Sequence, residues 1–296
     1  MKISVLTPTY NRANLLNKLY ESLVKNSEYG VEIEWLIMND GSTDNTDFVV
    51  KNFIEENKIN IKYFKQENQG KMIAINNLVD KANGDLIVDC DSDDYFTDNA
   101  FGIIKEEYEK NKNEKNIYTL CFLKYNTNGE NMGKMFSNKK TTMFNLYFKE
   151  GETGEKALVF FSEIRKKFRH KLEHNERFVT EARMYHEMDE KYQMICINKS
   201  IMICEYQEEG YTQNIIKQFK ENPYGYYEYF KEILKRNMHG VKFNKRLYTL
   251  KHYILFSYLT QNYQSKTIKS ITNKCLYYIL LIPGVIKSLN IKFKNT

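Results

Sequence analysis

The sequence predicts an α/β protein: a Rossmann-like, mostly parallel sheet with helices on both of its faces, followed by a C-terminal helical region. Three observations predict this class. Over the first hundred residues, short β-branched runs alternate with amphipathic helical runs. A polar turn follows each of the predicted strands. Of the 296 residues, 42% are apolar and 28% are charged, which is typical of a folded chain and excludes a disordered one.

Strands and helices alternate in the order of a parallel sheet, in which each connection needs a crossover helix. In the helix that we predict at residues 45–56, the periodicity places Phe48, Val49, Phe53 and Ile54 toward the sheet. The carboxyl ends of the strands should meet at one edge, where such sheets bind ligands. The predicted strands are residues 2–6, 34–39, 59–65 and 85–89, and the other predicted helices are residues 13–25 and 72–82.

Beyond residue 100 the pattern is looser. A turn-rich segment at residues 151–156 precedes an apolar strand, and from about residue 212 the chain is helical and aromatic. We therefore expect an α/β part at residues 1–210, in two halves at 1–110 and 111–210, and a helical part at residues 211–296. The predicted elements of the second half are strands at 116–124, 157–161 and 194–206, a helix at 178–192, and a mobile loop or hairpin at 126–140.

Neither the cysteines nor the N-terminus indicates secretion. The five cysteines are odd in number, scattered and without a Cys-x-x-Cys pair, so we expect free thiols in a reducing cytoplasm. The chain passes from Met1 into a strand with no signal-peptide pattern. No apolar run reaches the roughly 20 residues that a spanning helix needs. We expect a cytoplasmic protein.

The charge is distributed unevenly along the chain. Net charge is +6, yet the last acidic residue is Glu232. Twelve Lys and Arg and no acid follow it, so the first 232 residues, with 32 cations and 38 acids, carry a net −6. A basic tail of this kind seeks a polyanion, and because the chain shows no RNA-binding motif we expect no nucleic-acid partner.

An apolar run inside the tail favours a membrane surface as that polyanion. Residues 275–286 form 12 apolar residues, too few to span a bilayer but suited to lie in its surface. With six lysines from Lys266 onward, the tail is expected to hold the chain on the anionic inner face of a membrane. The alternative is a helical subdomain that packs on the rest of the chain or on a second subunit of a homo-oligomer.

Four carboxylates follow the fourth predicted strand within six residues: Asp89, Asp91, Asp93 and Asp94. In an extended segment alternate side chains face one way, so Asp89, Asp91 and Asp93 can converge. Carboxylates this close repel one another unless a cation neutralises them, and hard oxygen ligands favour Mg²⁺ or Mn²⁺. The alternative is a solvated acidic turn that caps the helix beginning near Asp98.

The other three turns carry groups suited to a nucleotide. Asp40, in a Gly-Ser turn, can accept a hydrogen bond from a nucleobase ring N–H, or can instead cap the next helix. Tyr10 can stack on a base, and Arg12 or Lys71 can pair with phosphate. Each alone is ordinary loop chemistry, and only their convergence at one edge favours a nucleotide site.

The turns read VLTPTYNR at residues 5–12, NDGSTD at 39–44, NQGK at 68–71 and DCDSDD at 89–94. In order and spacing they resemble the family-2 glycosyltransferases of GT-A fold, of the bacterial surface or capsular polysaccharide type. The resemblance is close over residues 1–110 and thinner to about residue 210. It implies that residues 1–110 form the nucleotide-sugar half of a catalytic domain and residues 111–210 the acceptor half.

The resemblance implies an inverting transferase that moves a sugar from a nucleotide-diphosphate sugar to a hydroxyl of a glycan or lipid-linked acceptor. UDP is the default nucleotide because Asp40 can pair with a pyrimidine N–H, although a guanine N–H would serve as well. Asp93 is the implied ligand of Mn²⁺ or Mg²⁺, which bridges the diphosphate and stabilises the charge on it as it leaves. The residues implied for donor binding are Pro8, Thr9, Tyr10, Arg12, Asp40, Lys71 and Asp91.

Inversion also needs a general base for the acceptor hydroxyl. The family usually supplies it from a Glu-Asp pair at a helix start, and the segment FVTEARMY at residues 178–185 resembles that region with Glu181 as the first acid and Ala182 in place of the second. Glu181 is the predicted catalytic base. Its alternative role is a first-turn acid favoured by the helix dipole. The rival bases are Glu152, Asp94 and His186.

Ala182 leaves a second class of function open, a nucleotide-sugar-binding module that has lost catalysis. A nucleotidyltransferase is disfavoured, because it would need a Gly-rich phosphate loop after the first strand and residues 7–12 contain no Gly.

Overall fold

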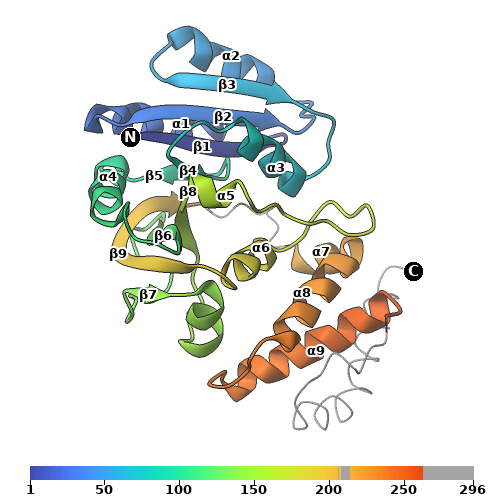
Figure 1. Cartoon of the computed structure of the whole chain (residues 1–296). Coiled ribbons are helices and arrows are strands. Elements are labelled where there is room, and N and C mark those ends of the chain that lie inside the picture. Colours follow the sequence, from blue (N-terminus) through green and yellow to red (C-terminus); the bar gives the residue numbers. More distant parts are fainter. Residues whose placement is uncertain (206, 208–213, 263–296) are drawn as a thin grey trace. The chain divides into compact units, whose positions relative to one another are not determined.

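The computed structural model describes residues 1–205, 207 and 214–262 (Figure 1). The chain divides into two compact units. The sheet unit comprises Met1–Leu146, Glu152–His170 and Met184–Gln207, and the helical unit comprises Tyr147–Gly151, Lys171–Arg183 and the chain from Glu208 onward. The predicted membrane segment, with its apolar run and lysines at residues 266–294, lies outside the described residues.

The sheet unit is built on one nine-stranded sheet of order β3-β2-β1-β4-β8-β6-β9-β5, with β7 paired to β9 (Figure 1). As predicted, β3, β2, β1 and β4 are parallel. Beyond β4 the sheet is mixed, because β8 is antiparallel to β4 and β6 while β9 is parallel to β6. The strands are β1 Lys2–Thr9, β2 Glu32–Asn39, β3 Asn60–Lys65, β4 Leu86–Asp89, β5 Asp94–Phe96, β6 Ile117–Asn126, β7 Lys140–Thr141, β8 Lys156–Phe161 and β9 Gln193–Cys204.

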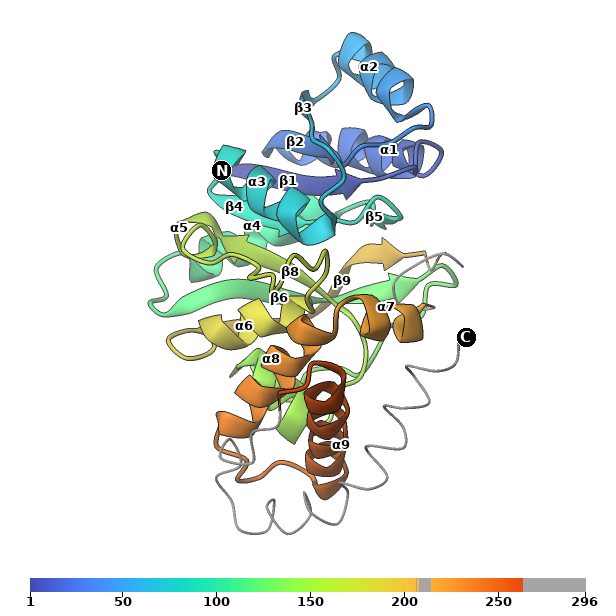
Figure 2. The same cartoon turned by 90° about the vertical axis from the view of Figure 1, so that its right-hand side faces the viewer.

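Helices cover both faces of the parallel strands, as predicted (Figures 1 and 2). On one face α1 (Leu16–Asn26), α2 (Thr46–Glu56) and α4 (Ala100–Asn111) share a core with the alternate β1 residues Ile3 and Val5. On the other face α3 (Lys71–Lys81) packs on β1 and β2. Because side chains alternate along a strand, β1, β2 and β4 are buried on both sides and read as largely apolar runs, whereas the edge strand β3 is only half-buried.

The orientation of α2 differs from the prediction. Val50 and Phe53 are buried as the helix packs on the sheet, whereas Phe48 is 65% exposed and Ile54 is 40% exposed. With Val50 directed inward, a residue two positions earlier lies about 200° around the helix and faces water. The prediction that Phe48 is in the core is therefore wrong. The same prediction for Ile54 is also wrong, because this residue lies in the last turn of α2 and is exposed, while Val49 is partly buried against the core as expected.

The second half of the sheet unit keeps the predicted strands with different boundaries. The predicted helix at residues 178–192 is shorter, since α6 runs from Glu181 to Met188. In the predicted loop at 126–140, a tight turn returns Asn131 to Tyr125 and the short strand β7 begins at Lys140. The remaining short helical segments of the chain's described part are α5 Ser162–Arg165 in this half, the 3₁₀ turn Ser27–Tyr29 in the first half and the π-helical turn Asn145–Lys149.

The helical unit contains α7 (Ile215–Glu221), α8 (Pro223–Lys235) and α9 (Phe243–Leu259). Aromatic rings join α8 to α9, among them the stacked pair Tyr226 and Phe256 with centroids 5.1 Å apart. At the start of α8 the Glu176 carboxylate accepts from the backbone N–H groups of Tyr224 and Gly225, each at 2.6 Å. Such a carboxylate cap satisfies N–H groups that a helix leaves unpaired. Within the described part of the chain, no helix has the length and apolar character to cross a bilayer.

Candidate active site

Four turns at the carboxyl edge of the parallel strands are joined into a closed ring by side-chain contacts. They follow β1 (residues 9–12), β2 (39–44), β3 (66–71) and β4 (89–94). The edge collects them because parallel strands all leave the sheet on the same side. The predicted convergence of these turns is therefore a property of the structure.

The first turn is joined to the second through Asn11. Its backbone N–H donates to Ser42 Oγ at 2.9 Å, and its Oδ1 accepts from the backbone N–H of Thr43 at 2.7 Å. Asn11 has a φ of 51°, a left-handed conformation that asparagine adopts more readily than most residues. The asparagine between Tyr10 and Arg12 thus sets the path of the first turn.

The second turn is joined to the third through Asp40, which is only 4% exposed. Its Oδ1 accepts from Gln66 Nε2 at 2.7 Å and from the backbone N–H of Gln69 at 2.9 Å. Its Oδ2 accepts from the backbone N–H of Gly70 at 2.8 Å. An ionised carboxylate has about four acceptor positions, so three are filled and one, on Oδ2, remains.

A glycine is required where the second and third turns meet. Gly41 has a φ of +81°, and a Cβ at this position would stand 2.9 Å from the backbone nitrogen of Asn68. Because of the left-handed conformation and the close backbone approach, any other residue at position 41 would force one of the two turns to shift.

Two ion pairs close the ring. Lys71 Nζ, at the start of α3, lies 2.7 Å from Asp91 Oδ2 and joins the third turn to the fourth. Arg12 Nη1 lies 2.5 Å from Asp93 Oδ2 and joins the fourth turn back to the first. Each pair combines a cation expected to meet phosphate with a carboxylate expected to face the donor or its metal ion.

The acidic segment itself is a turn, so the expectation that Asp89, Asp91 and Asp93 face one way is wrong. The backbone N–H of Asp94 donates to the carbonyl of Asp91 at 3.1 Å, and the alternation of an extended strand is lost. Each carboxylate instead meets a cation from a different element. The partners are Arg165 for Asp89, Lys71 for Asp91, Arg12 for Asp93 and Lys124 for Asp94.

Lys124 supports the acidic turn that follows β4. This β6 residue is 9% exposed, and its Nζ lies 2.7 Å from Asp94 Oδ2 and 3.4 Å from Glu155 Oε2. Burial alone would lower the pKa of Lys124, but the carboxylates of Asp94 and Glu155 hold it well above its usual value. The ammonium therefore stays charged and fixes Asp94, the residue next to Asp93.

The carboxylates of the ring fit a hard divalent cation that shares its ligands with a phosphate. Asp91 and Asp93 offer oxygen ligands on the fourth turn, at the edge where Arg12 and Lys71 gather. In the described residues, no group of three or more His, Cys, Asp or Glu side chains is arranged to hold a metal ion. Mg²⁺ and Mn²⁺ accept such sites, because they bind one or two carboxylates and take further ligands from substrate phosphates and water.

The remaining predicted donor residues lie at the end of β1. Pro8 and Thr9 are buried, and Tyr10 is 48% exposed beside them. An exposed ring next to a buried polar edge is suited to stacking on a base.

Glu181 is the first residue of α6 and is half-buried. It belongs to the helical unit, while the ring of turns belongs to the sheet unit. Its role as the catalytic base stays a prediction. The rival base His186 is buried on the same helix, with its ring edge-on to Phe144 at 5.8 Å.

The carboxylate of the rival base Glu152 is held by backbone N–H groups and by a lysine, which indicates a structural role. Its carboxylate accepts from the backbone N–H groups of Thr153 at 2.7 Å and Gly154 at 2.8 Å, and lies 3.3 Å from Lys156 Nζ. Burial would raise the pKa of Glu152, but these backbone donors and Lys156 hold it below its usual value. A general base needs the opposite, a pKa raised toward neutrality.

Among the site residues to which the sequence analysis gave no role are Asn11, Lys124 and Arg165. The sequence contained a signal for Lys124, because a lysine near the end of a buried apolar strand needs a buried acidic partner. Arg165, which is fully buried beside Asp89 and over the Phe160 ring, follows another apolar strand in the same way. Asn11 carried the weaker signal of an asparagine in a turn.

The architecture defines the class of protein: it is the fold of the GT-A glycosyltransferases. The S. aureus TarS 1–349 structure in complex with UDP-GlcNAc matches with a TM-score of 0.61 at 17% identity, over 99% of this chain and 92% of that one. A mannosyltransferase from Pyrobaculum calidifontis, in complex with GDP-Man and Mn²⁺, matches with a TM-score of 0.56 at 13% identity, over 99% and 88%. At these identities the likeness shows the fold.

The chain belongs to glycosyl transferase family 2, whose sequence pattern it matches over residues 4–172. An uncharacterized glycosyltransferase of Mycoplasma genitalium is 35% identical over 130 residues, 42% of this chain and 44% of that protein. The GalNAc(5)-diNAcBac-PP-undecaprenol beta-1,3-glucosyltransferase of Campylobacter jejuni is 29% identical over 182 residues, 60% and 54% of the two chains. The matches thus span about half the length of these relatives.

Proposed function

We propose that this glycosyltransferase is an inverting enzyme that moves a sugar from a UDP-sugar to a hydroxyl of a glycan or lipid-linked acceptor in surface polysaccharide synthesis. The observation that carries the proposal is the closed ring of four turns, in which two cations and two carboxylates face each other at the carboxyl edge of the sheet. The bound UDP-GlcNAc named for TarS and the undecaprenol-linked substrate named for the Campylobacter relative support this donor and acceptor class.

The hydrogen bonds of Asp40 favour uridine over guanosine. Only one acceptor position, on Oδ2, remains after Gln66, Gln69 and Gly70 have donated. The uracil edge offers a single ring N–H, which one acceptor satisfies. The guanine edge offers a ring N–H and an adjacent amino group, which need two acceptors side by side, and one of them would stay unpaired at a cost of about 1–3 kcal/mol.

The two ion pairs are proposed to exchange partners when the donor binds. Arg12 and Lys71 turn from Asp93 and Asp91 to the diphosphate oxygens, because charge-assisted bonds to phosphate are strong. The carboxylate of Asp93, with Asp91 beside it on the ribose or sugar side, becomes free to hold Mn²⁺ or Mg²⁺. When bound, such an ion neutralises the charge that develops on the leaving diphosphate. Pro8, Thr9 and Tyr10 line the nucleotide.

Glu181 is proposed as the general base. It takes the proton of the acceptor hydroxyl as that oxygen attacks the anomeric carbon from the face opposite the diphosphate, which inverts the configuration. We place the enzyme in the cytoplasm, on the inner face of the membrane where lipid-linked acceptors are made.

A thermal-shift panel tests the donor site directly. UDP-, GDP- and CDP-sugars are added to the full chain with and without Mn²⁺, and the midpoint of unfolding is recorded. We expect stabilisation by UDP-sugars that increases with Mn²⁺. A chain stabilised equally by all three nucleotides, or by none, contradicts the proposal. Release of UDP from a stabilising donor then separates an enzyme from a binding module that has lost catalysis.

A further inference from the structure

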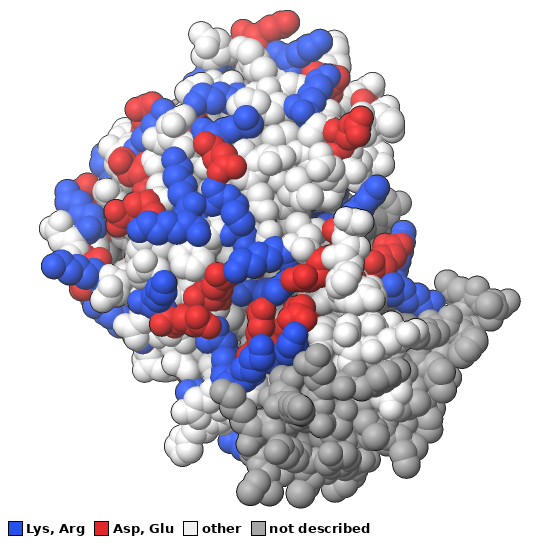
Figure 3. Space-filling model, turned by 45° about the vertical axis from the view of Figure 1, so that its right-hand side comes forward, with Lys and Arg blue, Asp and Glu red and all other residues white. Residues whose placement is uncertain are grey.

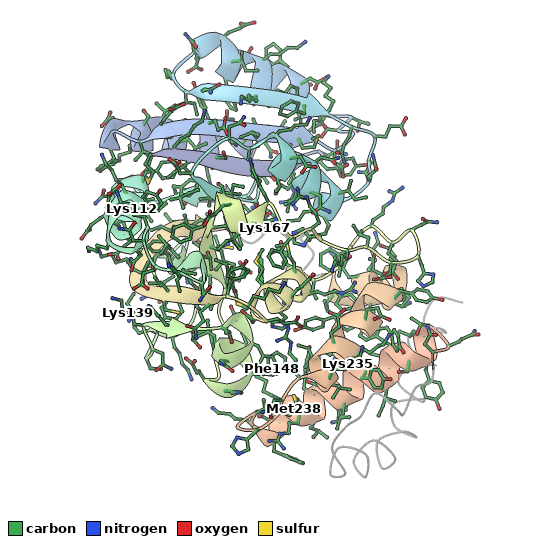
Figure 4. The ribbon with its side chains drawn as sticks, in the orientation of Figure 1. Lys112, Lys139, Phe148, Lys167, Lys235 and Met238 are labelled. Carbon is green, nitrogen blue, oxygen red and sulfur yellow. The ribbon has the colours of Figure 1, made fainter. Side chains whose placement is uncertain are left out.

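The turn between α8 and α9 combines exposed aromatic rings with a cluster of cations. We call residues 235–248 (KRNMHGVKFNKRLY) the α8–α9 tip. Phe243 is 62% exposed and Tyr248 is 49% exposed. The tip contains no Asp or Glu, and its cations are Lys235, Arg236, Lys242, Lys245 and Arg246. Figure 4 labels Lys235 and Met238 at this end of the helical unit.

Side-chain hydrogen bonds and buried apolar residues hold the tip in a defined turn. Arg246 Nη2 donates to the carbonyl of Met238 at 2.6 Å and Arg246 Nε donates to the carbonyl of Val241 at 3.0 Å. Met238 and Val241 are buried beneath the turn, and Gly240 has the positive φ of 77° that the turn requires. Since these groups fill the inside of the turn, Phe243 is held outward as the first residue of α9.

The two acids of α8 pair with cations that lie outside the tip. Glu232 lies 3.0 Å from Arg183, and Glu228 lies 2.7 Å from Lys231. Over the face of the sheet unit in Figure 3, by contrast, red and blue side chains are interleaved. In the sheet unit, for example, Lys110 pairs with Glu106 at 2.6 Å. The lysines of the tip, Lys235, Lys242 and Lys245, therefore add positive charge around an exposed aromatic ring.

We propose that the α8–α9 tip docks the chain on an anionic lipid bilayer. Phe243 enters the interfacial region, and the cations lie over the phosphate groups of the lipids. The pairing of an exposed aromatic ring with cations favours a bilayer over a dissolved polyanion, because a polyanion offers charge without an apolar phase. The docking surface lies in the helical unit and needs no donor, so it stands apart from the donor site proposed above.

Vesicle co-sedimentation of the full chain tests this surface. Vesicles of phosphatidylglycerol with phosphatidylcholine are compared with vesicles of phosphatidylcholine alone at 0.1 M salt. We expect binding to the anionic vesicles, with a loss of at least about tenfold in the variant K235E/K242E/K245E. The single variant Phe243→Ser should lose severalfold at unchanged charge. The matched control K51E/K115E/K139E changes the same charge on exposed lysines of the sheet unit and should keep most of the binding.

Two outcomes overturn the proposal. If the triple variant of the tip and Phe243→Ser sediment like the parent chain, the tip is not the docking surface. If the triple variant loses both vesicle and inorganic polyphosphate binding while Phe243→Ser keeps vesicle binding, the tip recognises a polyanion and not a bilayer. Stabilisation of each variant by UDP-sugar, measured without vesicles, shows that it is folded and separates failure of the tip from failure of the donor site.

Discussion

Arg12 and Asp93 lie 81 residues apart in the chain and form an ion pair across the site, with Nη1 and Oδ2 2.5 Å apart. The pair joins the first turn to the fourth. Their side chains are 25% and 19% exposed, so solvent and ligands can reach both partners. Arg12 therefore occupies the position at Asp93 that the proposed metal ion would take, and the two cations should compete.

Arg12→Ala should tighten Mn²⁺ binding in the absence of nucleotide. Removing the competing guanidinium frees Asp93, and a partly exposed pair is worth up to about 1 kcal/mol, or about fivefold in affinity. UDP binding should weaken about tenfold or more, because a charge-assisted contact to phosphate is lost. Electron paramagnetic resonance of free Mn²⁺ measures the first effect and calorimetry the second. Lys110→Ala, on α4, is the control, and a decrease in Mn²⁺ affinity of R12A would contradict the competition.

Asp40→Asn should lower both stability and uridine affinity. The substitution turns one carboxylate oxygen into an N–H donor that faces existing backbone donors, and a buried unsatisfied group costs about 1–3 kcal/mol. Urea unfolding gives the first quantity, and UDP titration gives the second. Glu67→Gln removes an exposed carboxylate from the same third turn and should change neither. Unaltered UDP affinity in D40N would exclude Asp40 as the base reader.

Lys124→Met should destabilise the chain by about 3–5 kcal/mol at pH 7, because it leaves Asp94 buried without its cation. The double variant Lys124→Met/Asp94→Asn should recover part of this loss, since the buried charge is removed as well. Chemical unfolding of the four members of the cycle measures the coupling. Additive losses would show that the two side chains do not act as a pair.

The free energy of unfolding should depend on Glu34 between about pH 4.5 and pH 2. Burial would raise the pKa of Glu34, but donation from Ser4, Lys62 and the backbone of Asn83 lowers it to about 2. A carboxyl group with a lowered folded-state pKa stabilises the fold above its unfolded value, and this stabilisation is lost as the pH falls through both values. The shift corresponds to about 3 kcal/mol. Urea titrations at pH 2.5, 3.5, 4.5 and 6 measure it, and Glu34→Gln should flatten the dependence.

Glu181→Gln should lower turnover by about 10²–10⁴-fold while UDP-sugar affinity stays within a factor of two, because a general base acts only in the reaction step. Glu152→Gln should show the reverse. It removes a buried charge that accepts from three backbone N–H groups, so unfolding should occur at lower denaturant while the remaining folded enzyme keeps its rate. Full turnover by E181Q would assign the base to another residue.

The parallel half of the fold was predictable because strands buried on both faces read as uninterrupted apolar runs. Their order then brought Asp40, Lys71 and Asp93 to one edge without further information. The partners of these side chains were not predictable, since a single turn at Asp91–Asp94 redirects every carboxylate of the segment. The same limit explains why β5 was missed, since this three-residue strand begins at Asp94, the last residue of the acidic segment. It also explains Phe48, because an error of one residue in the helical phase moves a side chain to another face.

The ring of contacts has a consequence for engineering the specificity of this enzyme. Each turn makes side-chain contacts with the turns on both sides of it, through Asn11, Asp40, Lys71 and Arg12. A single turn transplanted from a relative would therefore lose its matching partners in both neighbouring turns. Gly41 is bound in the same way to the backbone at Asn68. Chimeras that exchange all four turns together should keep their fold, whereas one-loop grafts should lose it.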